Sequence, residues 1–125
     1  MIKFKDILTE AYYMHGTSIR NIKSILTQGL DPDYGANGFW GSAIWANKEK
    51  TDVINDYYIN DSINNNDEIY ILFKTNIKPE KQDDRGYTFD DIIPPNTFQK
   101  IVFNGKVFTI DEFKKKLLWL NLKIY

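Results

Sequence analysis

The chain has 125 residues and a formal net charge of −1, from 16 basic and 17 acidic side chains. This length fits one domain of ordinary size. Because the sequence has no cysteine and one histidine, it excludes disulfides, thiolate metal centres and metal sites built on several histidines. The balanced charge indicates neither a nucleic-acid footprint nor an anionic membrane partner, and no apolar run approaches the ~18–20 residues that span a bilayer.

The first ten residues differ in character from the rest of the chain, and we expect a leader or a short N-terminal helix there. Phe4, Ile7 and Leu8 have the i, i+3, i+4 spacing of an amphipathic helix. The segment lacks the long apolar stretch of a secretory signal, which favours an intracellular location. Residues 11–125 are then expected to form a single domain.

A strand and a helix are predicted next. Residues 11–15 form an aromatic run that is typical of a strand. Ser18 is suited to cap the helix and Gly29 to end it. The apolar stripe of this helix consists of Ile19, Ile22, Ile25 and Leu26.

The middle of the chain predicts a loop, a strand and a second helix. Residues 31–41 are a loop by their glycine content, and residues 42–46 form a short strand. Thr51 is expected to cap the second helix, which ends before a polar turn over residues 61–67. One face of this helix is expected to carry Val53, Ile54, Tyr57 and Tyr58.

The last part of the chain predicts strands and a C-terminal helix. Residues 68–74 are the clearest strand of the sequence, and residues 86–89 are a further short one. Asn104-Gly105 is typical of a type I′ turn that joins two strands of a hairpin, 99–104 and 106–110. A capping box from Thr109 to Glu112 opens the helix, whose buried face is expected to contain Phe113, Leu117 and Leu120. The fold class is therefore α+β with antiparallel strands, and not a doubly wound parallel sheet.

Three segments carry a resemblance to a known family. They are Tyr13-Met14-His15-Gly16-Thr17-Ser18 before the first helix, Gln28-Gly29-Leu30-Asp31-Pro32 after it, and Ile44-Trp45-Ala46 before a helix with tyrosines. In this pattern the chain resembles the ADP-ribosyltransferase superfamily, in its His–Tyr–Glu branch of diphtheria-toxin-like and PARP-like enzymes. The resemblance covers roughly residues 12–103. It implies a split antiparallel β core with flanking helices, and NAD as the co-substrate.

The first motif is expected to hold the nicotinamide end of NAD. A glycine just past the end of a strand lets the backbone come close enough to offer its N–H and C=O to the carboxamide, and Gly16 suits this. The resemblance implies that His15 hydrogen-bonds a ribose hydroxyl and that Thr17 adds a hydroxyl beside it. The alternative is that His15 is a structural residue and Gly16 an ordinary turn glycine.

The resemblance implies that an aromatic of the strand and a tyrosine of the helix sandwich the nicotinamide ring. Trp45 matches the strand position, and Tyr57, with Tyr58 as second choice, matches the helix position. Stacking suits a flat, electron-poor ring. The alternative is that both tyrosines only fill the core or the surface.

A third motif should supply a carboxylate that stabilises an oxocarbenium-like transition state. Its expected position, near residues 87–88, holds no acid. The neighbouring acids are Asp84, Asp90 and Asp91, of which Asp90 fits best because alternation along the strand places it on the face of Thr88. The alternative is that all three are solvated loop acids and that the domain binds NAD without turning it over.

Leu8-Thr9-Glu10 before Ala11 resembles the processing sites of head-maturation proteases in large tailed phages. This implies possible cleavage after Glu10, packaging in a phage head, and work in the host or bacterial cytoplasm. The predicted function is mono-ADP-ribosylation of a host protein or nucleic acid, with catalytic residues His15, Tyr57 and Asp90 and without metal or membrane. The alternatives are a catalytically degenerate module for NAD or ADP-ribose, and a packaged phage protein that blocks a host factor.

Overall fold

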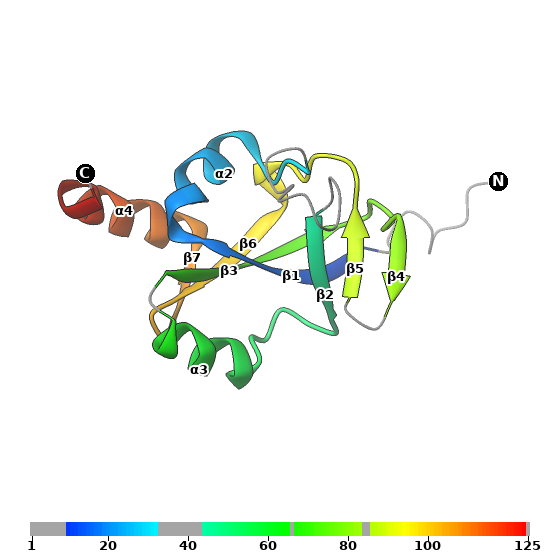
Figure 1. Ribbon diagram of the computed structural model, residues 1–125, viewed down its shortest axis with the longest axis horizontal. Coiled ribbons are helices and arrows are strands. Elements are labelled where there is room, and N and C mark those ends of the chain that lie inside the picture. Colours follow the sequence, from blue (N-terminus) through cyan, green and yellow to red (C-terminus); the bar gives the residue numbers. More distant parts are fainter. Residues whose placement is uncertain (1–9, 33–43, 66, 84–85, 125) are drawn as a thin grey trace.

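The protein is a mixed domain built on one antiparallel sheet (Figure 1). The computed structural model describes residues 10–32, 44–65, 67–83 and 86–124, with the backbone alone at Asp83 and over 120–124. The sheet has seven strands in the order β4-β5-β2-β1-β3-β6-β7, and every neighbouring pair is antiparallel. The strands are β1 Ala11–Ser18, β2 Ile44–Glu49, β3 Glu68–Thr75, β4 Lys81–Asp83, β5 Gly86–Phe89, β6 Phe98–Phe103 and β7 Lys106–Thr109.

Helices lie on both faces of the sheet (Figure 1). On one face the 3₁₀ turn η1, Ile19–Asn21, continues into α2, Ile22–Gln28. On the other face lies α3, Asp56–Asn64. The last helix, α4, Ile110–Ile124, packs its Phe113 and Leu117 side chains into the same core as α2. A second 3₁₀ turn, η2, Pro95–Thr97, precedes β6.

Each face of the sheet has its own core, because successive side chains of a strand point to opposite faces. The larger core lies under α2 and α4 and includes Tyr13, Ile71 and Phe73. The smaller core lies under α3 and consists of Met14, Tyr58, Tyr70, Leu72 and Val102. We call these two sides the α2 face and the α3 face. Along β1, the side chain of Tyr13 belongs to the α2 face and that of Met14 to the α3 face.

Local sequence signals set the ends of α2. The Ser18 hydroxyl accepts a hydrogen bond from the Arg20 N–H at 3.3 Å, which caps the 3₁₀ turn. Gly29 ends the helix with φ 93°, a conformation that favours glycine. Leu30 and Ile93 then exchange two backbone hydrogen bonds, both 2.9 Å long, so the segment after the helix is tied to the segment before η2.

The prediction for the second helix was wrong at both ends, since the helix begins later than expected and continues to Asn64, into the predicted polar turn. Helix α3 begins at Asp56, and the Asn55 side chain caps it by accepting from the Tyr57 N–H at 2.9 Å. Thr51 instead accepts from the Val53 N–H at 3.1 Å, in a turn before the helix. The expected common face does not form either, since Tyr58 is buried whereas Tyr57 is 64% exposed and Val53 74% exposed.

The predicted C-terminal elements are confirmed. The turn residues Asn104 and Gly105 have φ of 51° and 77°, as a type I′ hairpin requires. In the capping box, Glu112 accepts from the Thr109 N–H at 2.9 Å, and Thr109 accepts from the Glu112 N–H at 3.2 Å. Phe113 and Leu117 are buried as expected, whereas the side chain of Leu120 lies outside the described residues.

The observed class is α+β, as predicted. Strand β4, which pairs with β5, was not predicted, and the first two strands extend further than expected. Residues 1–9 of the predicted N-terminal helix or leader, and residues 33–41 of the predicted loop, lie outside the described residues. Within the described part of the chain, no helix is long and apolar enough to cross a membrane.

Candidate functional site

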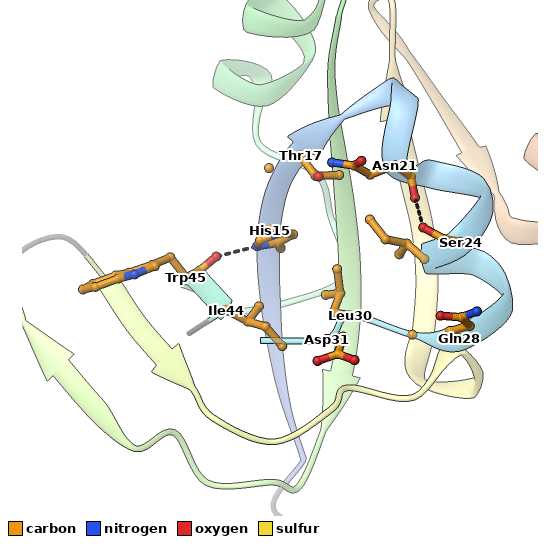
Figure 2. Close-up of a pocket in the computed structure, with 12 residues that line it drawn as sticks. His15, Thr17, Asn21, Ser24, Gln28, Leu30, Asp31, Ile44 and Trp45 are labelled. Carbon is orange, nitrogen blue, oxygen red and sulfur yellow. Dashed lines mark hydrogen bonds between the residues drawn. The ribbon is translucent and has the colours of Figure 1, made fainter. Parts of the chain in front are cut away.

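A pocket of about 330 Å³ lies on the α2 face, between β1, α2 and the start of β2. Apolar side chains of Ile25, Leu30 and Ile44 form part of its wall. Polar side chains gather at its two ends: Figure 2 shows Thr17 and Asn21 at one end and Gln28 and Asp31 at the other. The remaining lining residues are His15, Gly16, Ser24, Gly29 and Trp45. An apolar middle between polar ends suits a nucleoside-sized ligand with a flat ring and hydroxyl groups.

His15 lines this pocket at the point where β1 and β2 stop pairing. The paired residues of the two strands end at Met14 and Asn47. One step further, the His15 imidazole donates from Nδ1 to the Trp45 carbonyl oxygen at 2.6 Å. Because a carbonyl only accepts, Nδ1 carries the proton, and Nε2 of the neutral ring carries a lone pair. His15 therefore offers a hydrogen-bond acceptor to a ligand.

The surroundings of His15 favour this neutral form. Burial lowers the pKa of the imidazole below its ordinary value of 6.5, and the hydrogen bond to the Trp45 carbonyl opposes this only in part. At neutral pH the ring is therefore uncharged. An uncharged imidazole with a fixed tautomer is suited to bind a hydroxyl group.

The polar side chains along α2 form the rest of the lining. Asn21, Ser24 and Gln28 are exposed on one side of the helix, and the Ser24 hydroxyl donates to the Asn21 carbonyl oxygen at 3.0 Å. Thr17 follows His15 by two residues on β1 and is half-buried on the same face. These groups offer donors and acceptors without a charge. Among the described residues that line the pocket, none is a lysine or an arginine.

Trp45 contributes its backbone, and not its side chain, to the site. Its carbonyl oxygen holds His15, whereas Figure 2 shows its ring directed away from the pocket. The alternation along β2 explains this direction, because the neighbours Ile44 and Ala46 belong to the core of the α2 face. The Trp45 side chain consequently belongs to the α3 face.

Tyr57 and Tyr58 do not face His15. Helix α3 lies on the other side of the sheet, where Tyr58 packs against Met14 and Tyr70. The expected nicotinamide site, in which His15 and a tyrosine of α3 contact the same end of NAD, is therefore wrong as a geometry, because the two side chains lie on opposite faces of the sheet. The physical reason is the pleat of β1, which sends adjacent side chains to opposite faces. Whether each residue binds ligand stays a prediction.

Two tyrosines of the α3 face are bound to carboxylates. The Tyr58 hydroxyl donates to Glu49 Oε2 at 3.3 Å, and the Tyr70 hydroxyl donates to Asp61 Oδ2. Burial and the neighbouring Glu49 raise the pKa of Tyr58 to about 12. Burial also raises the pKa of Tyr70, with the hydrogen bond to Asp61 adding to it. Both hydroxyls are therefore protonated donors at neutral pH.

Gly16 opens toward this second face. A Cβ built on Gly16 would lie 2.7 Å from Glu68 Oε1 and 2.9 Å from Tyr70 Cε1. The glycine thus lets a carboxylate come close to the backbone beside the His-Gly motif. Burial, with the nearby charge of Asp61, raises the pKa of the Glu68 carboxyl above its ordinary value. Glu68 was not predicted as a site residue, because it is far from Gly16 along the chain and its position at the start of β3 carries no local signal of this contact.

The predicted third acid lies apart from the pocket. Asp90 and Asp91 are exposed just after β5, and neither lines the pocket. Asp84 lies outside the described residues. Among the described residues, the acid that lines the pocket is Asp31. No group of three or more histidine or carboxylate side chains in the described ranges is placed to hold a metal ion.

The missed lining residues had a signal in the sequence. Asn21, Ser24 and Gln28 recur at i, i+3 and i+7, which places them on one side of the first helix. That side lines the same pocket as the His-Gly motif. Searching the helix for a polar stripe next to its apolar stripe would have found three of the lining residues.

No family model matches this chain, and searches of curated proteins and of solved structures likewise found no match.

Proposed function

We propose that this chain binds NAD and transfers its ADP-ribose to a macromolecular acceptor, a host protein or a nucleic acid, with release of nicotinamide. The proposal starts from the resemblance of its His-Gly-Thr motif and of the segments after it. The observation that carries it is the position of His15, whose neutral imidazole lies in a polar pocket with Nδ1 bound to the Trp45 carbonyl. This leaves Nε2 as an acceptor for a ribose hydroxyl.

The two faces of β1 suggest which end of NAD binds on which side of the sheet. His15 and Thr17 line the pocket of the α2 face, which has the volume and the mixed lining of a nucleoside site. Gly16 opens toward the α3 face, to which the Trp45 ring and Tyr58 also belong. The proposal requires NAD to reach around the end of the β1–β2 pairing and to contact both faces. In this arrangement, nicotinamide stacks on the α3 face and the rest of the molecule occupies the pocket.

The reaction needs little covalent chemistry from the protein. The bond between ribose C1′ and the pyridinium nitrogen breaks, and its electron pair neutralises the nicotinamide that leaves. The acceptor nucleophile then bonds to C1′ and loses its proton. A carboxylate that faces the developing positive charge stabilises the transition state. Glu68, which lies against Gly16, is better placed for this role than the exposed Asp90.

Nicotinamide release tests the proposal. The protein is incubated with NAD and a host lysate, and free nicotinamide is measured for the wild type, His15→Ala, Glu68→Gln and Asp90→Asn. We expect release by the wild type, loss of at least tenfold in the first two variants, and little change in Asp90→Asn. Glu80→Gln removes an exposed carboxylate and serves as the control. If the wild type releases no nicotinamide and transfers no label from labelled NAD, the proposed transferase activity is refuted.

A second candidate is a module that binds NAD or ADP-ribose without turning it over. The observation that favours it is the separation of His15 from the predicted aromatics and from Asp90. Such a module would sequester the nucleotide or block a host factor. Saturable ADP-ribose binding by the wild type, without nicotinamide release at any acceptor concentration, would identify it.

The proposed phage origin concerns the segment before the domain. Cleavage after Glu10 and packaging in a phage head stay predictions, since residues 1–9 lie outside the described part. N-terminal sequencing of the protein from infected cells tests them. A mature chain that begins at Ala11 would support processing, and a chain that keeps residues 1–10 in the virion would contradict it.

A further inference from the structure

Helix α4 carries exposed apolar side chains that its own core does not use. The inner side of the helix packs Phe113 and Leu117 into the core of the α2 face. Elsewhere on the helix, Leu118 is 70% exposed and Trp119 is 77% exposed. Figure 1 shows that α4 extends beyond the sheet toward the C-terminus. An exposed tryptophan next to an exposed leucine is typical of a surface that binds a partner.

Lysines adjoin these apolar side chains. The residues at 114, 115 and 116 are all lysines, and all are exposed. Lys114 and Lys115 lie on the same side of the helix as Leu118, because they precede it by four and three residues. Within the described residues, none of the three lysines forms an ion pair with a carboxylate. We call the α4 surface the group of Lys114, Lys115, Leu118 and Trp119. It suits a partner that combines apolar side chains with carboxylates.

The outer side of α3 and the turn before it have this complementary composition. Residues 51–67 contain four aspartates and no lysine or arginine. Two large apolar side chains are exposed there, Val53 at 74% and Tyr57 at 64%. Asp52 and Asp56 each precede one of them directly and are exposed as well. We call the α3 surface the group of Asp52, Val53, Asp56 and Tyr57.

The two surfaces cannot meet within one chain, because their helices lie on opposite faces of the sheet. A second copy can, however, place its α4 surface on the α3 surface of the first. Two copies that do so reciprocally form a closed two-fold dimer, in which the same contact occurs twice. Asp52 also lies 3.9 Å from the Lys100 ammonium, but such an exposed pair contributes little and does not prevent a new contact.

We propose that this protein forms a two-fold dimer in which the α4 surface of each copy packs on the α3 surface of the other. The apolar side chains of the two surfaces contact each other, and the lysines lie near the aspartates. A nucleic acid would pair with the lysines and leave Leu118 without an apolar contact, whereas the α3 surface offers partners to both. This inference does not depend on the proposed function.

Charge reversal tests the pairing of the two surfaces. Light scattering after size-exclusion chromatography measures the mass over a dilution series at about 0.05 M salt. Lys114→Glu/Lys115→Glu and Asp52→Lys/Asp56→Lys each bring like charges together, so we expect each to raise the dissociation constant of the dimer at least tenfold. An equimolar mixture of these two variants should restore the dimer, because the α4 surface of each then meets an α3 surface of opposite charge.

Two further variants separate this contact from general effects of charge. Lys78→Glu/Lys81→Glu reverses two exposed lysines at and before the strand β4, at the other edge of the sheet, and should leave the dissociation constant unchanged. Trp119→Ala removes an exposed apolar side chain without a change of charge and should raise it at least tenfold. Circular dichroism checks that each variant is folded.

Three results would overturn the inference. The first is a wild type that stays monomeric up to about 0.5 mM, whether or not it binds anionic vesicles or RNA through Trp119. The second is a dimer that persists in both folded charge-reversal variants, since another surface would then form it. The third is a mixture of these variants that stays monomeric although the wild type dimerises.

Discussion

The burial of His15 in the pocket determines the pKa of its imidazole. Because burial lowers the imidazole pKa, we expect a titration midpoint below 6.5, the ordinary value for histidine. The sequence has one histidine, so its ring protons in an NMR titration need no assignment. A midpoint at or above 6.5 would show that the ring is not buried against the Trp45 carbonyl.

The same shift makes stability depend on pH. Between the lowered folded pKa and 6.5, the unfolded chain binds more protons at His15 than the folded chain, so the free energy of unfolding rises with pH in this window. The stabilisation is complete above 6.5 and is lost as the pH falls through the folded pKa. Urea unfolding of the wild type and of His15→Gln at pH 7.5 and at pH 5 measures this. The wild type should lose more stability on acidification than the variant, and equal losses would contradict the assignment.

Two glycines tolerate a methyl group to different degrees. Gly16 has an extended backbone, and a Cβ there meets the movable Glu68 carboxylate and the Tyr70 ring. Gly29 has φ 93°, and a Cβ there meets the backbone carbonyl of Ile93. We expect Gly16→Ala to cost about 1–3 kcal/mol and Gly29→Ala more, since strain at positive φ adds about 1–2 kcal/mol. Urea unfolding of both variants checks the order, and the reverse order would contradict the packing around these two glycines.

At the scale of the elements, the start of α3 can be tested by its caps. Asn55→Ala removes the side chain that accepts from the Tyr57 N–H and should lower the free energy of unfolding by about 1 kcal/mol. Thr51→Ala removes a hydroxyl in the turn before the helix and should change it by less than about 0.5 kcal/mol. Chemical denaturation of the two variants compares them. A larger loss of unfolding free energy in Thr51→Ala than in Asn55→Ala would instead support a helix that begins after Thr51, as the sequence predicted.

Elements with strong local signals could be predicted from the sequence. The Asn104-Gly105 turn, the capping box at Thr109 and the helix end at Gly29 each depend on side chains within a few residues, and all three are confirmed. The start of α3 was wrong because Thr51 and Asn55 both suit a cap, and tertiary packing of Tyr58 decides between them. Strand β4 was missed because its polar sequence forms a strand only when paired with β5.

For the whole molecule, ligand binding should appear as thermal stabilisation. A ligand that binds only the folded state at 100 times its dissociation constant adds about 2.7 kcal/mol, which for a domain of this size raises the melting temperature by roughly 10 °C. We expect this shift with ADP-ribose for the wild type and a much smaller one for His15→Ala. Inorganic phosphate serves as the control ligand. An equal shift in the variant would place the ligand away from the His15 pocket.

The site was less predictable than the fold, since it depends on which face each element covers. Sequence alone placed His15, Gly16 and Thr17 at the end of one strand and Trp45 within another, and His15, Thr17 and the Trp45 backbone indeed meet at the pocket. It did not show that α3 crosses to the far side of the sheet, because the connection from β2 to α3 carries no local signal for its direction. The position of Asp31 in the pocket lining and the contact of Glu68 with Gly16 were missed for the same reason, because both depend on tertiary packing.

The pleat of β1 has a consequence for how this protein can change over time. Because neighbouring residues of the strand serve separate surfaces, point substitutions can remodel the environment of one surface while the other keeps its composition. A single-residue insertion or deletion inside the strand has the opposite effect, since it exchanges the partners of every side chain beyond it at once. Descendants of this sequence should therefore diversify by substitution in β1 and confine changes of length to the connecting segments.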